Sequence, residues 1–222
     1  MNKIFSLNIL KNINKLIREN LKIIIILIVL LFLSFLIYQT YSYYKQSIIK
    51  KDSITYFNLK ELDDKIKINE IMLSLSKKNN FYSLLATLDL IDENIQNQNY
   101  NELKTLYLNI LNNFNLDNVY VSAIASHAAY NFINIQNDNL NLNFIEDTNE
   151  FISYIDEDQK SYKEIKYELQ YLNLVTEYEK NNISYHSSTA VIDLYNLIMT
   201  SENISSNIKE RVNKIHEFQL YK

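Results

Sequence analysis

The chain has 222 residues, a formal net charge of −4 at pH 7, and no Gly, Pro or Cys. Without Cys, a disulfide framework and thiol catalysis are excluded, and without Gly no GxGxxG or GxxxxGK phosphate-binding loop can exist. Tight two-residue hairpin turns, which favour Gly, are expected to be rare, which argues against a β-sandwich or β-barrel. We therefore predict an all-α fold in which Asn takes the left-handed backbone position where Gly usually ends a helix.

The longest apolar segment runs from Ile23 to Tyr44 and contains no charged residue. As a helix that rises about 1.5 Å per residue it reaches roughly 33 Å, enough for a hydrocarbon core of about 30 Å. A cleaved signal peptide needs small residues near the cut, whereas the first Ala of the chain is Ala86. A core helix normally has a polar face, but Ser34 is the only polar residue up to Ile37. We predict a retained transmembrane helix at residues 23–44.

Basic residues are more frequent before this helix than directly after it. Five precede it and three follow it closely: Lys3, Lys11, Lys15, Arg18 and Lys22, then Lys45, Lys50 and Lys51. The positive-inside rule then predicts a cytoplasmic basic arm at residues 1–22 and a domain outside the cytoplasm at residues 45–222, with the chain crossing the membrane once.

The predicted outer domain is acidic. Residues 1–51 carry eight Lys or Arg against Glu19, a charge of +7, so the total of −4 leaves −11 on residues 52–222. Nucleic acids require clustered Lys and Arg, and anionic lipid surfaces attract basic segments. We therefore expect no nucleic-acid partner.

Clusters of Asn and Asp divide this domain into amphipathic helices. Apolar residues recur with helical spacing from Phe81 to Ile95. A second helix follows it closely, because Asn99 and Glu102 form a capping-box pattern. Further antiparallel pairs are predicted at residues 119–135 with 142–155 and at 162–178 with 189–199, and a last helix at about 205–220.

The segment LIDENIQNQNYNELKTLYLNIL resembles a degenerate tetratricopeptide (TPR) motif. Three of its signature positions depart from the motif, since Ile91 replaces a small residue, Asn94 an aromatic residue and Leu103 an Ala. The resemblance implies a TPR-like right-handed array of antiparallel helix pairs. The signature positions are Leu90, Ile91, Asn94, Tyr100, Leu103, Tyr107 and Ile110.

Four of the six Ala residues lie in one segment, SAIASHAAY, as Ala123, Ala125, Ala128 and Ala129. Small side chains let helix backbones approach closely, so we predict that this helix is central and packed on both sides. The alternative is a smooth groove for a client peptide.

The three histidines give no recognisable catalytic or metal-binding pattern, since none belongs to an HExxH or similar ligand spacing. We interpret His127 as a core residue of the Ala-rich helix, and His186 and His216 as surface residues. The sequence therefore predicts no cofactor and no enzymatic activity.

The basic arm, the single span and the acidic helical domain together resemble the YfgM-like proteins of proteobacterial inner membranes. FYSLLATLDLIDENIQNQNYNELKTLYLNIL and the Ala-rich helix are the best-matching segments. The resemblance implies that the chain crosses a bacterial inner membrane once and that residues 45–222 form a periplasmic domain. It also implies a membrane-tethered protein-interaction module, an accessory of the Sec translocon that meets exported proteins together with periplasmic chaperones. The alternative is a non-catalytic structural subunit that stabilises another inner-membrane or envelope-assembly complex.

Overall fold

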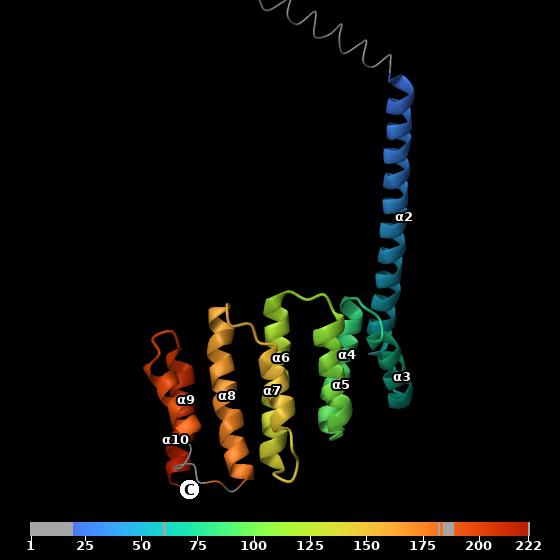
Figure 1. Cartoon of the computed structure of the whole chain (residues 1–222). Coiled ribbons are helices and arrows are strands. Elements are labelled where there is room, and N and C mark those ends of the chain that lie inside the picture. Colours follow the sequence, from blue (N-terminus) through green and yellow to red (C-terminus); the bar gives the residue numbers. More distant parts are fainter. Residues whose placement is uncertain (1–19, 60, 182, 184–188, 222) are drawn as a thin grey trace, which may run out of the picture. The chain divides into compact units, whose positions relative to one another are not determined.

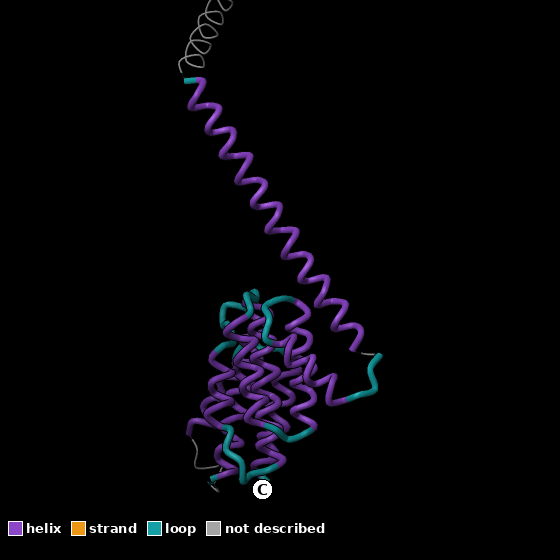
Figure 2. The backbone as a smooth tube through the Cα atoms, turned by 90° about the vertical axis from the view of Figure 1, so that its right-hand side faces the viewer, coloured by secondary structure: helices purple, strands orange, loops and turns teal. Residues whose placement is uncertain are grey.

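The computed structural model describes residues 20–59, 61–181, 183 and 189–221. These residues form helices joined by loops and contain no strand (Figure 2). The all-α class predicted from composition is therefore confirmed for this part of the chain. The predicted basic arm, residues 1–22, lies outside it except for its last three residues.

The chain divides into two compact units, Met1–Asp63 and Asp64–Lys222. The described part of the first unit is dominated by one helix, α2 (Leu21–Leu59). Its apolar part has a mean hydropathy of 3.0, and none of that 18-residue window is buried. By length and composition, α2 can cross a membrane. The helix continues beyond the predicted span, from Lys45 to Leu59, which adds about 22 Å at 1.5 Å per residue.

Two hydroxyl groups of the apolar part of α2 are satisfied within the helix itself. Ser34 donates to the carbonyl of Leu31 at 2.8 Å, and Thr40 donates to that of Leu36 at 2.9 Å. A hydroxyl bonded to a preceding carbonyl needs no water, so neither residue opposes transfer of this helix into a hydrocarbon environment.

The second unit contains helices α3 to α10, which lie side by side in chain order (Figure 1). The helices predicted from the sequence are present with ends that differ by a few residues, whereas α3 was not predicted. Their bounds are α3 Lys65–Ser76, α4 Phe81–Gln96, α5 Tyr100–Asn113, α6 Asn118–Asp138, α7 Ile145–Ser153, α8 Lys160–Lys180, α9 Thr189–Thr200 and α10 Ser206–Leu220.

A Schellman motif ends α4. Gln98 has a φ of 57°, and it is the only residue with positive φ in the described chain. Its N–H donates to the Ile95 carbonyl at 3.2 Å, and the Asn99 N–H donates to the Asn94 carbonyl at 3.0 Å. The prediction that Asn takes the left-handed position is wrong here. Asn97 lies one residue too early and keeps a right-handed conformation.

The capping box predicted at the start of α5 is also wrong. Asn99 makes no side-chain capping bond. Its backbone N–H, which Glu102 would have to reach, already donates to the Asn94 carbonyl of α4. A capping box is found instead at the start of α4. There the Asn80 side chain accepts from the Ser83 N–H at 3.2 Å, and the Asn80 N–H donates to the Ser83 hydroxyl at 2.8 Å.

Hydrogen bonds between polar side chains join helices that are two apart in the chain. The partners are 38 to 43 positions apart, and their numbers rise together, so α6, α8 and α10 run in one direction, as do α5 and α7. In this part of the second unit, α6, α8 and α10 therefore lie in one layer, and α5 and α7 lie in another. The pairs are Tyr130–Glu168 and Asn137–Thr176 between α6 and α8, Glu168–Arg211 and Glu179–Gln219 between α8 and α10, Lys104–Asp147 between α5 and α7, and Asn112 of α5 with Tyr154, which directly follows α7.

The core of the second unit is built around α6, which contacts α5, α7 and α8. Three aromatic rings meet there, with Phe132 stacked on Phe151 at 5.3 Å between centroids and Tyr107 edge-on to Phe151 at 5.7 Å. All three are fully buried, and each contributes roughly 1.5–3 kcal/mol through its apolar area. Leu169 belongs to this core and Tyr171 to a second one shared with α9 and α10, so α8 connects the two.

Candidate functional site

The TPR-like signature residues lie in the hairpin of α4 and α5, mostly as core residues. Asn94 is partly buried and donates to the Leu90 carbonyl at 2.8 Å. Tyr100 is also partly buried, with its ring edge-on to Phe144 at 5.5 Å. These seven residues therefore build the hairpin and leave little surface for a ligand. The fully buried ones are Leu90, Ile91, Leu103, Tyr107 and Ile110.

The Ala-rich segment lies in α6. Ala125, Ala128 and Ala129 have no exposed surface, and Ala123 is partly buried. Their small side chains lie where α6 meets its neighbours, which matches close packing of helices. In this structure Ala125, Ala128 and Ala129 are therefore core residues of the unit.

The prediction that His127 is a core residue is wrong, because its side chain is exposed. The helix turns its alanines inward and this ring outward, where His127 Nδ1 lies 2.9 Å from the Tyr107 hydroxyl. Asn131 donates to the same hydroxyl at 2.7 Å. Burial raises the pKa of Tyr107 above its ordinary value, so this hydroxyl stays protonated and acts as a hydrogen-bonding group.

The other two histidines differ in what the structure describes. His216 is partly buried, with its ring stacked on Tyr195 at 3.7 Å between centroids. His186 lies outside the described residues. Within the described ranges, no three His, Cys, Asp or Glu side chains come together in a way that could hold a metal ion.

A buried ionic contact between α8 and α10 also involves a tyrosine of α6. Glu168, which is 3% exposed, accepts from Arg211 Nε at 2.7 Å and from Arg211 Nη2 at 2.6 Å. Tyr130 donates to the same carboxylate at 2.8 Å. Hydrogen bonding to Glu168 raises the pKa of Arg211, and burial raises that of Tyr130. These groups satisfy one another, so we assign them a structural role.

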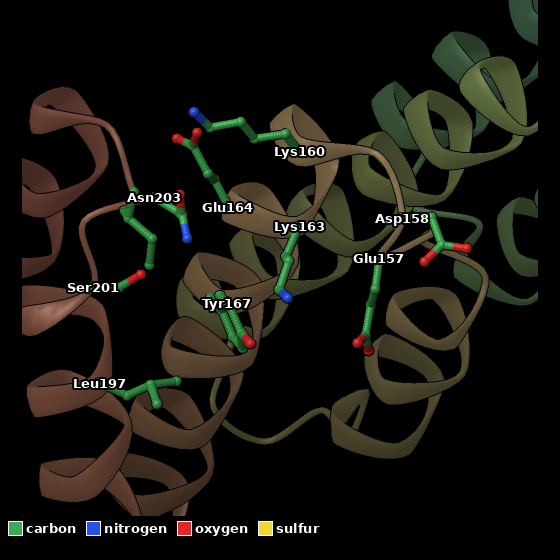
Figure 3. Close-up of a pocket in the computed structure, with 10 residues that line it drawn as sticks. Glu157, Asp158, Lys160, Lys163, Glu164, Tyr167, Leu197, Ser201 and Asn203 are labelled. Carbon is green, nitrogen blue, oxygen red and sulfur yellow. The ribbon is translucent and has the colours of Figure 1, made fainter.

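A pocket of about 400 Å³ opens at the start of α8 (Figure 3). Its charged residues come from the α7–α8 connection and from the first turns of α8. They are Glu157, Asp158, Lys160, Lys163 and Glu164. This volume lies at the lower end of the range for ligand-binding pockets.

The opposite wall of the pocket comes from α9 and the connection to α10. Leu197 and Ile204 supply apolar surface, and Ser201 and Asn203 supply polar groups. Tyr167 of α8 lies between the two walls in Figure 3. Leu197 is 47% exposed, so its side chain adds apolar surface to this wall. The pocket thus combines an apolar surface with charged groups.

Two lysines in the first turn of α8 oppose the helix dipole. Lys160 is the first residue of the helix and Lys163 is the fourth. The first turn contains no acidic residue. A cation at a helix N-terminus costs about 0.3–1 kcal/mol, where a carboxylate would be favourable. The lysines were not singled out in the sequence, although their unfavourable placement in the segment DEDQKSYKE is a signal that can be read there.

No family model, curated protein or solved structure matches this chain. The resemblance to YfgM-like proteins therefore stays a prediction, and the candidate site rests on its own geometry.

Proposed function

We propose that this chain is a non-catalytic protein-interaction module tethered to a membrane by α2. In this proposal the N-terminus lies in the cytoplasm of a bacterium, α2 crosses the inner membrane once, and the second unit works in the periplasm. The module assists exported proteins beside the Sec translocon and its chaperones. The translocon role comes from the resemblance to YfgM-like proteins.

The observation that carries the membrane tether is that the apolar 18-residue window of α2 contains no buried residue. Phe32 and Ile37, for example, are 61% and 70% exposed. Exposed apolar surface costs about 25 cal/mol per Å² in water, so a run of such side chains requires another environment. A hydrocarbon core about 30 Å thick provides it.

The layered second unit supports a role in protein interaction. Helices two apart are linked at separations of 38 to 43 residues, somewhat longer than the 34 residues of a TPR repeat. Stacked helical pairs of this kind present extended surfaces for protein partners. We infer a TPR-like array from this layering.

Co-purification from membranes tests the proposed function. The full chain, tagged after Lys222, is solubilised in mild detergent, and the captured proteins are compared with those of a control that keeps residues 1–63 alone. Translocon subunits and exported chains that depend on residues 64–222 would support the proposal. Capture of one stoichiometric membrane partner without exported clients would contradict it and favour a structural subunit.

The proposed orientation has a separate test. A reporter enzyme that folds only outside the cytoplasm should be active when fused after Lys222. Activity of a cytoplasm-only reporter at the same junction would refute the periplasmic assignment, while leaving the interaction role open to the co-purification test.

A further inference from the structure

The uncharged segment of α2 from Ile23 to Tyr44 contains a single side-chain amide, that of Gln39. Counted at 1.5 Å per residue from Ile23 at one boundary, Gln39 lies about 24 Å along the helix and about 6 Å inside the far boundary of a 30 Å hydrocarbon core. The Cα–Cβ bonds of a helix tilt toward its N-terminus, so this side chain starts toward the middle of the core and away from the nearer boundary. Gln39 therefore carries polar groups into a region without water.

The Gln39 amide forms no hydrogen bond with any residue that the structure describes. Ser34 and Thr40, by contrast, donate to carbonyls of their own helix. An amide has two N–H donors and one carbonyl acceptor, and polar groups left unpaired in hydrocarbon are costly. Gln39 therefore requires a polar partner at the same depth of the membrane.

Gln39 lies on a helix face on which residues recur every three or four positions. Phe32 and Phe35 precede it by seven and four positions, and Ser42 and Gln46 follow it by three and seven. This is the spacing with which two helices pack along a common seam. The seam places large apolar side chains in the middle of the membrane and the amide near its outer boundary.

The chain limits this seam in length and to one face of α2. Lys50 lies on the same face one turn after Gln46, and two lysines would repel each other across a parallel pair of helices. The opposite face carries Ile37 and Tyr41, neither of which needs a polar partner deep in the core. We therefore confine the seam to the face of Gln39 and end it at Gln46.

We propose that α2 pairs in parallel with α2 of a second copy of this chain, with the two Gln39 amides bonded to each other. A second copy inserts with the same orientation and so places its own Gln39 at the same depth. The amide is self-complementary, because each Gln39 can donate an N–H to the carbonyl oxygen of the other. This inference rests on the membrane tether of the proposed function. The dimer holds two second units together, which strengthens capture of a partner that has two binding segments.

Energy transfer in lipid vesicles measures the pairing. The chain has no Cys, so one Cys added after Lys222 takes a donor or an acceptor dye, and the labelled full chains are mixed in vesicles of phosphatidylethanolamine and phosphatidylglycerol. Gln39→Leu should weaken the dimer about 5- to 30-fold, the range expected for an interhelical hydrogen bond. Thr40→Leu removes a hydroxyl that already bonds to the Leu36 carbonyl, so this matched control should keep the parent affinity.

Disulfide formation in membranes locates the seam. Phe35→Cys and Ser42→Cys, each the single Cys of its chain, should cross-link to a dimer under mild oxidation. Ile37→Cys should not, because the opposite faces of the two helices lie too far apart for a disulfide. Adding Gln39→Leu to the Phe35→Cys chain should reduce its cross-linking.

The inference is overturned if the parent chain is monomeric, if Gln39→Leu keeps the parent affinity, or if Ile37→Cys cross-links as readily as Phe35→Cys. Its failure can be separated from failure of the membrane tether, because carbonate extraction reports on the tether alone. A parent chain that resists extraction but stays monomeric keeps the tether and loses only the pairing, whereas a parent chain that is extracted loses both.

Discussion

Arg211 of α10 holds Glu168 of α8 through two parallel hydrogen bonds of 2.7 and 2.6 Å. The carboxylate is 3% exposed, whereas the Arg211 side chain is 54% exposed. Arg211→Ala should therefore leave a buried charge with Tyr130 as its remaining partner. We expect the free energy of unfolding to fall by about 2–4 kcal/mol, measured by urea denaturation of the full chain in detergent.

A surface ion pair on the same helix provides the control. Lys214 and Glu210 lie one turn apart and are 71% and 66% exposed, so Lys214→Ala should leave the urea midpoint essentially unchanged. Arg211→Lys should be intermediate, because an ammonium group keeps the charge but cannot form the parallel pair. Equal midpoints for Arg211→Ala and Lys214→Ala would show that Glu168 is solvated.

Local patterns in the sequence were enough to place most of the helices. The apolar spacing from Phe81 to Ile95 predicted α4, which runs from Phe81 to Gln96. Helix α3 was missed because its first residues, KIKIN, alternate between polar and apolar as in a strand. The N-cap Asp64 stabilises a helix there by accepting from the Ile66 and Lys67 N–H groups at 3.1 and 3.2 Å.

Features that depend on packing between distant segments were not accessible from the sequence. The pocket exists because the α7–α8 connection and α9 approach the same end of α8, which brings Leu197 near Lys163. The exposure of His127 depends on which face of α6 packs into the core. Ala125, Ala128 and Ala129 lie on that face, but their spacing alone did not show that His127 lies on the opposite one.

The left-handed conformation of Gln98 predicts a stabilising substitution. A residue with a Cβ atom is strained by roughly 1–2 kcal/mol at this φ, and Gly avoids that strain. Part of the gain is lost because Gly has more conformational freedom in the unfolded chain, which stabilises the unfolded state. Gln98→Gly should raise the free energy of unfolding by about 0.5–1 kcal/mol. Asn97→Gly, one residue earlier in a right-handed conformation, should be destabilising, and stabilisation by both substitutions would contradict the Schellman assignment.

The packing of α6 predicts a cost for enlarging its alanines. Ala128 and Ala129 are fully buried, so Ala128→Leu and Ala129→Leu should each overpack the core. We expect each to lower the free energy of unfolding by about 1–3 kcal/mol. Thermal unfolding of the full chain should occur several degrees lower. Ala190→Leu, at an exposed position of α9, is the matched control. Parent-like melting of both α6 variants, with loss of captured partners, would instead indicate a binding groove.

The membrane tether predicts a strong effect of charge near the middle of the apolar part of α2. Leu30→Arg should impair integration, because a guanidinium at mid-span costs about 2.5–3.5 kcal/mol on the insertion scale. Carbonate extraction of membranes measures the change, and Leu30→Phe, which keeps the segment apolar, is the control. Undiminished resistance of Leu30→Arg to extraction would argue against a single span whose hydrophobicity is essential.

Burial of Tyr107 predicts a loss of stability at alkaline pH. Burial raises its pKa in the folded chain, while an unfolded tyrosine ionises near pH 10. The unfolded state therefore loses the proton first. The contribution of this hydroxyl is complete below about pH 10 and declines above it, by about 1.4 kcal/mol per pH unit until the folded state also ionises.

Urea midpoints measured between pH 8 and 11.5 test this dependence. Tyr107→Phe should be less stable than the parent at pH 8, by about 1 kcal/mol, because it loses the hydrogen bonds to His127 and Asn131. Above pH 10 its stability should fall less steeply than that of the parent, so the two curves converge. Tyr221→Phe, at a residue that is 90% exposed, should keep the parent slope. Parallel curves for Tyr107→Phe and the parent would mean that the folded chain ionises Tyr107 as readily as the unfolded chain does, which contradicts its burial beneath α6.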